Sequence, residues 1–214
     1  MENKEPIQVT DPEVTRVKFE NEIQKFRTVE DKYRAKGILC TKVIYPNIYF
    51  VFGIPKLIPY PIVFSVKINF TNYDIEPPSV KFINPFTEEL LKREQIPIHF
   101  IQINNSNLLQ PLELVQGVGD IMPFFCIPGI REYHDHPAHS GDSWLLYRDK
   151  GEGGLLFVLD QLYSTSIPMV KGYQLIVNHL QTVRINQEIV VQQNLMLPQI
   201  PLSPQVPLLP QNPM

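Results

Sequence analysis

The sequence is poor in cysteine, in long apolar runs and in positive charge. Its two cysteines, Cys40 and Cys126, do not make a disulfide framework, so we expect reduced thiols in a cytoplasmic protein. The formal net charge is -3 and no basic cluster stands out, which argues against a nucleic-acid partner. The longest apolar runs are far too short to cross a bilayer, and the first residues lack the apolar segment of a signal peptide.

Hydrophobic residues are plentiful, at 43%, and the first of them are spaced as in a helix. Thr10, Asp11, Pro12 and Glu13 are typical of a helix start, because they combine a capping side chain, a proline in the first turn and an acid near the positive end of the helix dipole. Apolar residues follow at steps of mostly three and four as far as Ala35, and Gly37 ends the helix. The expected apolar face consists of Val14, Val17, Phe19, Ile23, Phe26, Val29 and Tyr33.

The middle of the chain changes to runs of Val, Ile, Phe and Tyr separated by turn residues. These runs cover residues 38–45, 48–52, 62–70 and 79–82. Short strands joined by short turns predict an antiparallel meander, and the preceding helix predicts an α+β fold with that helix packed on the sheet. After Gly154, the leucine spacing predicts a buried helix over 155–163, and a further helix is expected over about 169–185.

We divide the chain into a flexible lead (1–10), one domain (11–186) and a Pro-rich tail (187–214). In the tail, proline recurs at every third position from Pro198 to Pro213. Polyproline II has three residues per turn, so these prolines would line one edge of an extended helix. Two interpretations stay open: a Pro-rich tail without a fixed structure, or a stiff strip that docks on a groove of its own domain or of a partner.

The segment from Gly53 to Phe86, GIPKLIPYPIVFSVKINFTNYDIEPPSVKFINPF, resembles the central part of ubiquitin-conjugating (E2) domains. The shared features follow the order of that family: a helix, a meander with a turn at Gly53–Pro55, a Pro-Tyr pair at 59–60, and a Tyr-x-x-x-Pro-Pro segment at Tyr73–Pro78. The resemblance covers residues 13–86, so it implies an E2-like (UBC-like) fold: a helix, a four-stranded meander and C-terminal helices.

The resemblance resumes around Trp144 and implies a cysteine that accepts ubiquitin as a thioester shortly before that residue. Cys126 takes this place in the sequence. The chain departs from the family in one respect, because residues 119–125 contain no Asn, whereas E2 domains usually place a His-Pro-Asn motif before the cysteine. This departure puts ordinary E2 chemistry in question.

The loop at 124–144 concentrates residues that bind metals or activate nucleophiles. Its main candidates are Cys126, Glu132, His134 and His136, with His139 as a substitute. On an extended chain the alternating Glu and His side chains would all point to one side, and together with the thiolate they form a plausible Zn²⁺ set. The pattern is similar to the Cys-Glu-His-His signature of a predicted metal-binding family from bacterial gene clusters that also encode ubiquitin-like proteins, E1-like activating enzymes and JAB-type isopeptidases.

Other interpretations of this loop compete with zinc. Cys126 could be a nucleophile, with His134 or His136 as its base or activator and Asp135 or Asp142 orienting the imidazole. The loop could also be a solvated polar segment without chemistry. A metal-dependent isopeptidase is a lesser alternative, because the spacing of Ser140 and Asp142 after the His-x-His pair differs from that of JAB-type enzymes.

The sequence therefore predicts an E2-like component of a bacterial ubiquitin-like conjugation pathway, a transferase that uses Cys126. Its expected partners are a ubiquitin-like protein and an E1-like activating enzyme. The alternative is a non-catalytic E2-like module that binds one of these proteins and is braced by metal.

If the metal interpretation is right, the purified protein should contain about one equivalent of zinc. Elemental analysis should show that His134→Ala and His136→Ala both lose it. Metal-free protein with unchanged stability would contradict the prediction.

Overall fold

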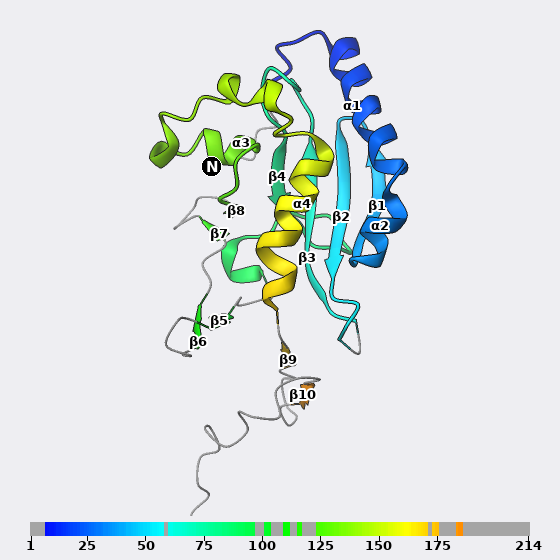
Figure 1. The fold of residues 1–214 in the computed structure, drawn as a ribbon, viewed down its shortest axis with the longest axis vertical. Helices are drawn as coiled ribbons and strands as arrows, with labels where there is room; N and C mark the ends of the chain where they lie inside the picture. Colours follow the sequence, from blue (N-terminus) through cyan, green and yellow to red (C-terminus); the bar gives the residue numbers. More distant parts are fainter. Residues whose placement is uncertain are drawn as a thin grey trace, which may run out of the picture.

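A computed structural model describes the protein over residues 7–57, 60–96, 101–103, 109–111, 115–116, 123–170, 173–175 and 183–185. Figure 1 shows a twisted sheet with α1 and α2 along one edge and α4 crossing in front of it. The first six residues of the predicted lead and the predicted tail at 187–214 lie outside the described residues. Within the described part of the chain, no helix has the length and apolar character needed to cross a membrane.

The N-terminal helical region consists of α1 (Pro12–Arg27) and α2 (Glu30–Ala35). As predicted, Asp11 caps α1, and its carboxylate accepts a bond from the Glu13 N–H at 2.9 Å. The single continuous helix was a wrong prediction, because the β-branched Val29 has a non-helical backbone conformation that separates α1 from α2. The region still ends at Ala35, followed by Gly37 at a φ of 89°.

The buried face of α1 differs from the predicted apolar face. Val14 and Val17 are exposed, whereas Thr15 and Glu22 are buried beside Phe19 and Phe26. Thr15 satisfies its hydroxyl by donating to the Asp11 carbonyl at 3.2 Å. Two polar side chains can therefore occupy the core side of α1 because each has a specific partner.

The predicted antiparallel meander is confirmed. Its strands are β1 (Ile38–Ile44), β2 (Asn47–Gly53), β3 (Ile62–Asn69) and β4 (Ser79–Phe82), in the order β1-β2-β3-β4. The register places Phe52 opposite Phe64, and their rings stack with centroids 4.5 Å apart. Phe64, Val66 and Ile68 of β3 lie in the buried core with apolar residues of α1 and α4, so the α+β prediction holds.

The predicted helix after Gly154 is α4 (Leu155–Ser166). Its buried apolar side chains are in the same core cluster as Phe26 of α1. The Glu22 carboxylate accepts the free backbone N–H of Leu155 at 2.7 Å, so α1 caps the N-terminus of α4.

The prediction of a helix over 169–185 was wrong for the described residues of this range. There the chain forms η5 (Ile167–Met169) and then two paired strands, β9 (Tyr173–Leu175) and β10 (Val183–Ile185). Helical turns before this region are α3 (Arg131–His134), η1 (Arg93–Gln95), η2 (Pro137–His139), η3 (Trp144–Leu146) and η4 (Arg148–Lys150). Two further strand pairs are β5 (Ile101–Ile103) with β6 (Leu109–Pro111) and β7 (Val115–Gln116) with β8 (Phe124–Phe125).

Removing the Glu22 cap should destabilise the protein, because the Leu155 N–H would stay buried without an acceptor. We expect Glu22→Ala to lower the free energy of unfolding by about 2–3 kcal/mol. Glu20→Ala is the matched control, since Glu20 lies on the exposed side of α1 in an ion pair with Arg16, and should cost less than about 0.5 kcal/mol. Urea unfolding of both variants measures the difference, and similar losses would contradict the assigned cap.

Candidate functional site

The segment before Cys126 is anchored in the aromatic core. Phe125 packs against Phe64 and Phe82, with ring centroids 5.2 and 4.9 Å away. Phe125 and Ile127 are both buried, whereas Cys126 between them is half-buried. The thiol therefore sits at the edge of the core on a backbone fixed by two buried neighbours.

Helix α3 is bound to the segment that leads into β4. Arg131 donates from its backbone to the Pro78 carbonyl at 2.9 Å and from its guanidinium to the Thr71 carbonyl at 2.7 Å. The same guanidinium pairs with Glu76 at 3.1 Å. The Pro-Pro segment identified in the sequence is thus the docking surface of α3.

The Glu132 carboxylate points to β4. It accepts hydrogen bonds from the Ser79 hydroxyl and from the Val80 N–H, the latter at 3.0 Å. Burial raises the pKa of Glu132, and these two hydrogen bonds oppose the shift. Glu132 therefore fixes the loop to the sheet, and its carboxylate oxygens are already engaged there.

Cys126 meets the imidazole of His139, the residue predicted only as a substitute. The Cys126 Sγ lies 3.3 Å from the His139 Nε2, within reach for proton transfer. The His139 ring stacks on the Tyr133 ring, with centroids 3.9 Å apart and an interplanar angle of 23°. Burial raises the pKa of the Cys126 thiol, so a nearby proton acceptor matters for its reactivity.

Asp142 is held between two tyrosines beside this pair. Its carboxylate accepts from the Tyr133 hydroxyl at 2.8 Å and from the Tyr147 hydroxyl at 3.1 Å. Both bonds lower the pKa of Asp142, and the neighbouring His139 and His134 lower it further. The Asp142 bond raises the pKa of Tyr133 to about 12, so this hydroxyl stays a donor at neutral pH. Sequence reasoning missed both tyrosines, since nothing in their spacing marks them as partners of an aspartate.

His134 and His136 have partners of their own. His134 Nδ1 lies 2.6 Å from the Asp142 carbonyl, and its Nε2 accepts from the Gly129 N–H at 3.4 Å. His136 Nδ1 accepts from the Ala138 N–H at 3.2 Å, and its ring lies 5.8 Å from that of His139.

The expectation that Glu132, His134 and His136 share one side was wrong in its geometry. Residues 131–134 form the helical turn α3, where positions two apart point in different directions. Over the described ranges, no group of three or more His, Cys, Asp or Glu side chains is arranged to hold a metal ion. Cys126 and His139 supply two of the four ligands that structural zinc usually takes, and zinc binding stays a prediction.

The raised pKa of Glu132 predicts a pH-dependent contribution to stability. The folded chain holds the proton more tightly than the unfolded chain, so the stabilisation is present below the ordinary pKa of 4.5 and is lost as the pH rises through the raised value. The stability of the wild type relative to Glu132→Gln should therefore fall as the pH rises from the ordinary pKa of 4.5 through the raised value. Urea unfolding across this range measures it, with Glu20→Gln as a charge-matched exposed control. A difference that grows with pH would contradict the expected sign.

Comparison with known proteins shows that most of the chain matches a defined family. The model of the Y4jH family, described as Y4jH-like, matches residues 10–170. A relative from Sinorhizobium fredii (strain NBRC 101917 / NGR234), named "Uncharacterized protein y4jH", is 40% identical over 171 residues, which cover 73% of this chain and 83% of the relative. The matched region includes α1, the whole meander, the Cys126 loop and α4. The chain belongs to the Y4jH-like family.

Proposed function

We propose that this protein is a thiol-dependent acyl transferase of the E2 type, which carries the C-terminus of a ubiquitin-like protein on Cys126. The observation that carries the proposal is the 3.3 Å approach of Cys126 Sγ to His139 Nε2 at a half-buried position. A nucleophilic thiol next to a positioned imidazole is a recurrent arrangement for acyl transfer. An E1-like enzyme would supply the activated C-terminus as a thioester.

The reaction exchanges one thioester for another. As Cys126 Sγ attacks the acyl carbon, its proton passes to His139, the new S–C bond forms, and the bond between the acyl carbon and the E1 sulfur breaks. His139 then gives the proton to the departing thiol. In the second step, an amine of the acceptor displaces Cys126, which leaves as a thiol.

The elements that carry the resemblance to E2 domains are joined around this loop, which supports the proposal. The Trp144 indole N–H donates to the Asp74 carbonyl at 2.8 Å, so the Trp-containing turn rests on the Tyr-x-x-x-Pro-Pro segment. Arg131 holds the same segment through the Pro77 and Pro78 carbonyls. The helix and the four-stranded meander also occur in the order that the resemblance implies.

His139 provides a way to activate Cys126 although the chain lacks the His-Pro-Asn motif that E2 domains usually have. The thiol has a raised pKa, so little thiolate is present at neutral pH and removal of its proton is part of the barrier. A stacked imidazole at 3.3 Å provides a base for that proton. We therefore propose that His139 acts as a general base that removes the proton of the Cys126 thiol, and that this activation supports acyl transfer in a chain without the His-Pro-Asn motif.

A peptide ending in Gly-Gly, prepared as a mercaptoethanesulfonate thioester, tests the proposal without knowledge of the natural modifier. The wild type should form a dithiothreitol-labile adduct, seen by mass spectrometry, that Cys126→Ala abolishes. Cys126→Ser should give an adduct that resists dithiothreitol and is cleaved by hydroxide. Cys40 is the control thiol, since burial also raises its pKa, and Cys40→Ala should leave the adduct unchanged. Acylation of Cys40 in place of Cys126 would contradict the proposal.

The role of His139 has its own prediction. His139→Asn should slow adduct formation about 10²-fold at neutral pH, the usual contribution of a general base. The slowing should shrink as the pH rises, because hydroxide then removes the thiol proton. His136→Asn is the matched control, since His136 bonds the Ala138 N–H and should leave the rate within about twofold. Equal rates for the wild type and His139→Asn would remove His139 from the mechanism.

A further inference from the structure

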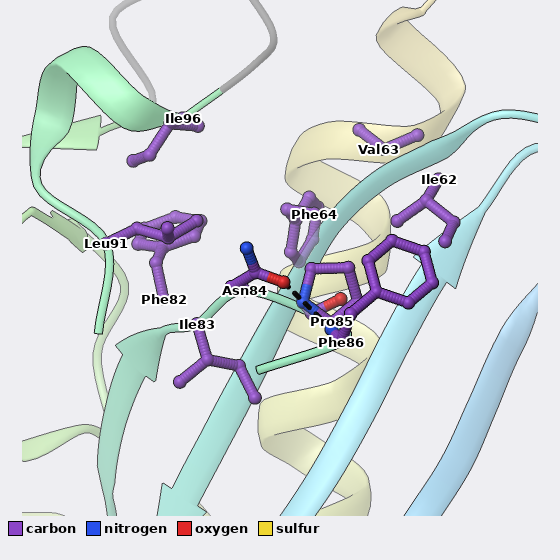
Figure 2. A pocket seen from close by; sticks show the side chains of 11 residues that line it. Ile62, Val63, Phe64, Phe82, Ile83, Asn84, Pro85, Phe86, Leu91 and Ile96 are labelled. Atoms are coloured by element: carbon purple, nitrogen blue, oxygen red, sulfur yellow. Dashed lines mark hydrogen bonds between the residues drawn. The ribbon is translucent and has the colours of Figure 1, made fainter. Parts of the chain in front are cut away.

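An apolar pocket with a cavity of about 240 Å³ lies at one end of the sheet, apart from the Cys126–His139 pair. Figure 2 shows Phe64 of β3 and Phe82 of β4 in its wall, with Ile62 and Phe86 also lining it. Phe86 is 85% exposed, which is unusual for so large an apolar side chain. Its backbone N–H donates to the Asn84 Oδ1 at 2.8 Å, so the turn that presents the ring is ordered.

One polar group in the pocket wall lacks a partner. Ser65 is 1% exposed, and within the described part of the structure its hydroxyl makes no hydrogen bond. A buried hydroxyl normally has a partner, because leaving one unpaired is costly. The Ser65 hydroxyl is buried behind the pocket wall, so the surface that a ligand can reach in this pocket is apolar. None of the eleven lining side chains is charged, which disfavours a charged ligand.

We propose that residues 198–213 of this same chain dock in this pocket as a polyproline II helix. This segment contains no charged residue, and Ile, Leu and Val alternate with its prolines. Polyproline II leaves every backbone carbonyl free to accept a hydrogen bond, and such helices dock on grooves lined by aromatic rings. The segment thus offers apolar rings and side chains to the two exposed residues on the pocket rim, Phe86 and Ile62.

The chain length makes an intramolecular contact favourable. The described residues end at Ile185 in β10, and 12 residues separate it from Pro198. At about 3.3 Å per extended residue, this length spans a domain of this size. A tethered segment meets its site at an effective concentration of about millimolar, so a weak contact is enough. The proposal is independent of the chemistry of Cys126.

Disulfide trapping in the full-length chain tests the proposal. In a Cys40→Ser, Cys126→Ser background, Ile62→Cys on the pocket rim is combined with Leu208→Cys. The control pair replaces Ile62→Cys with Ile44→Cys, at the far end of β1, where the side chain is 56% exposed compared with 40% for Ile62. Under oxidised glutathione, the pocket pair should close at least about tenfold faster than the control, at a rate independent of protein concentration.

Adding Phe86→Ser should slow closure of the pocket pair severalfold, whereas Val17→Ser, at an exposed site on α1, should leave it unchanged. Circular dichroism checks that each variant is folded. Equal closure rates for the two pairs, or no effect of Phe86→Ser, would overturn the proposal. Disulfides that form only between two chains would also overturn it, since the occupant would then be a second copy.

Discussion

The Glu132 carboxylate is the contact on which the arrangement of the Cys126 loop depends. It joins α3 to the start of β4 through the Ser79 hydroxyl and the Val80 N–H. Because this contact fixes α3 against the sheet, the adjacent Tyr133 is held where its ring stacks on His139. A strand of the core thereby determines where an imidazole stands relative to Cys126.

The loop is also held at its two ends. Phe125 lies in the aromatic core on one side, and on the other side Trp144 bonds the Asp74 carbonyl. Gly153 adopts a φ of 75° and has no side chain, which the Trp144 ring requires, because a Cβ there would lie 2.4 Å from it. The Sγ–Nε2 approach of 3.3 Å thus belongs to a loop bound at both ends and in the middle.

Much of the fold could be predicted from the sequence, because it follows from the spacing of apolar residues. The four strands and α4 follow directly from that spacing. The buried face of α1 could not be predicted in this way, since Thr15 and Glu22 are buried where each makes a specific hydrogen bond. The expected helix over 169–185 was wrong for a similar reason, because strand pairing across an intervening segment is not visible in local spacing.

For the candidate site, the available residue types can be read from the sequence: one cysteine beside a loop rich in histidine, with a Pro-Pro segment and a tryptophan to hold it. Which of these residues contact one another depends on the folded backbone. Residues 131–134 form a helical turn, so the Glu132 side chain points to β4. In the same turn, the His134 side chain points to the Asp142 carbonyl and the Gly129 N–H. The later η2 turn brings His139 to Cys126. Side-chain direction depends on the local backbone, and here contacts with a distant strand fix that backbone.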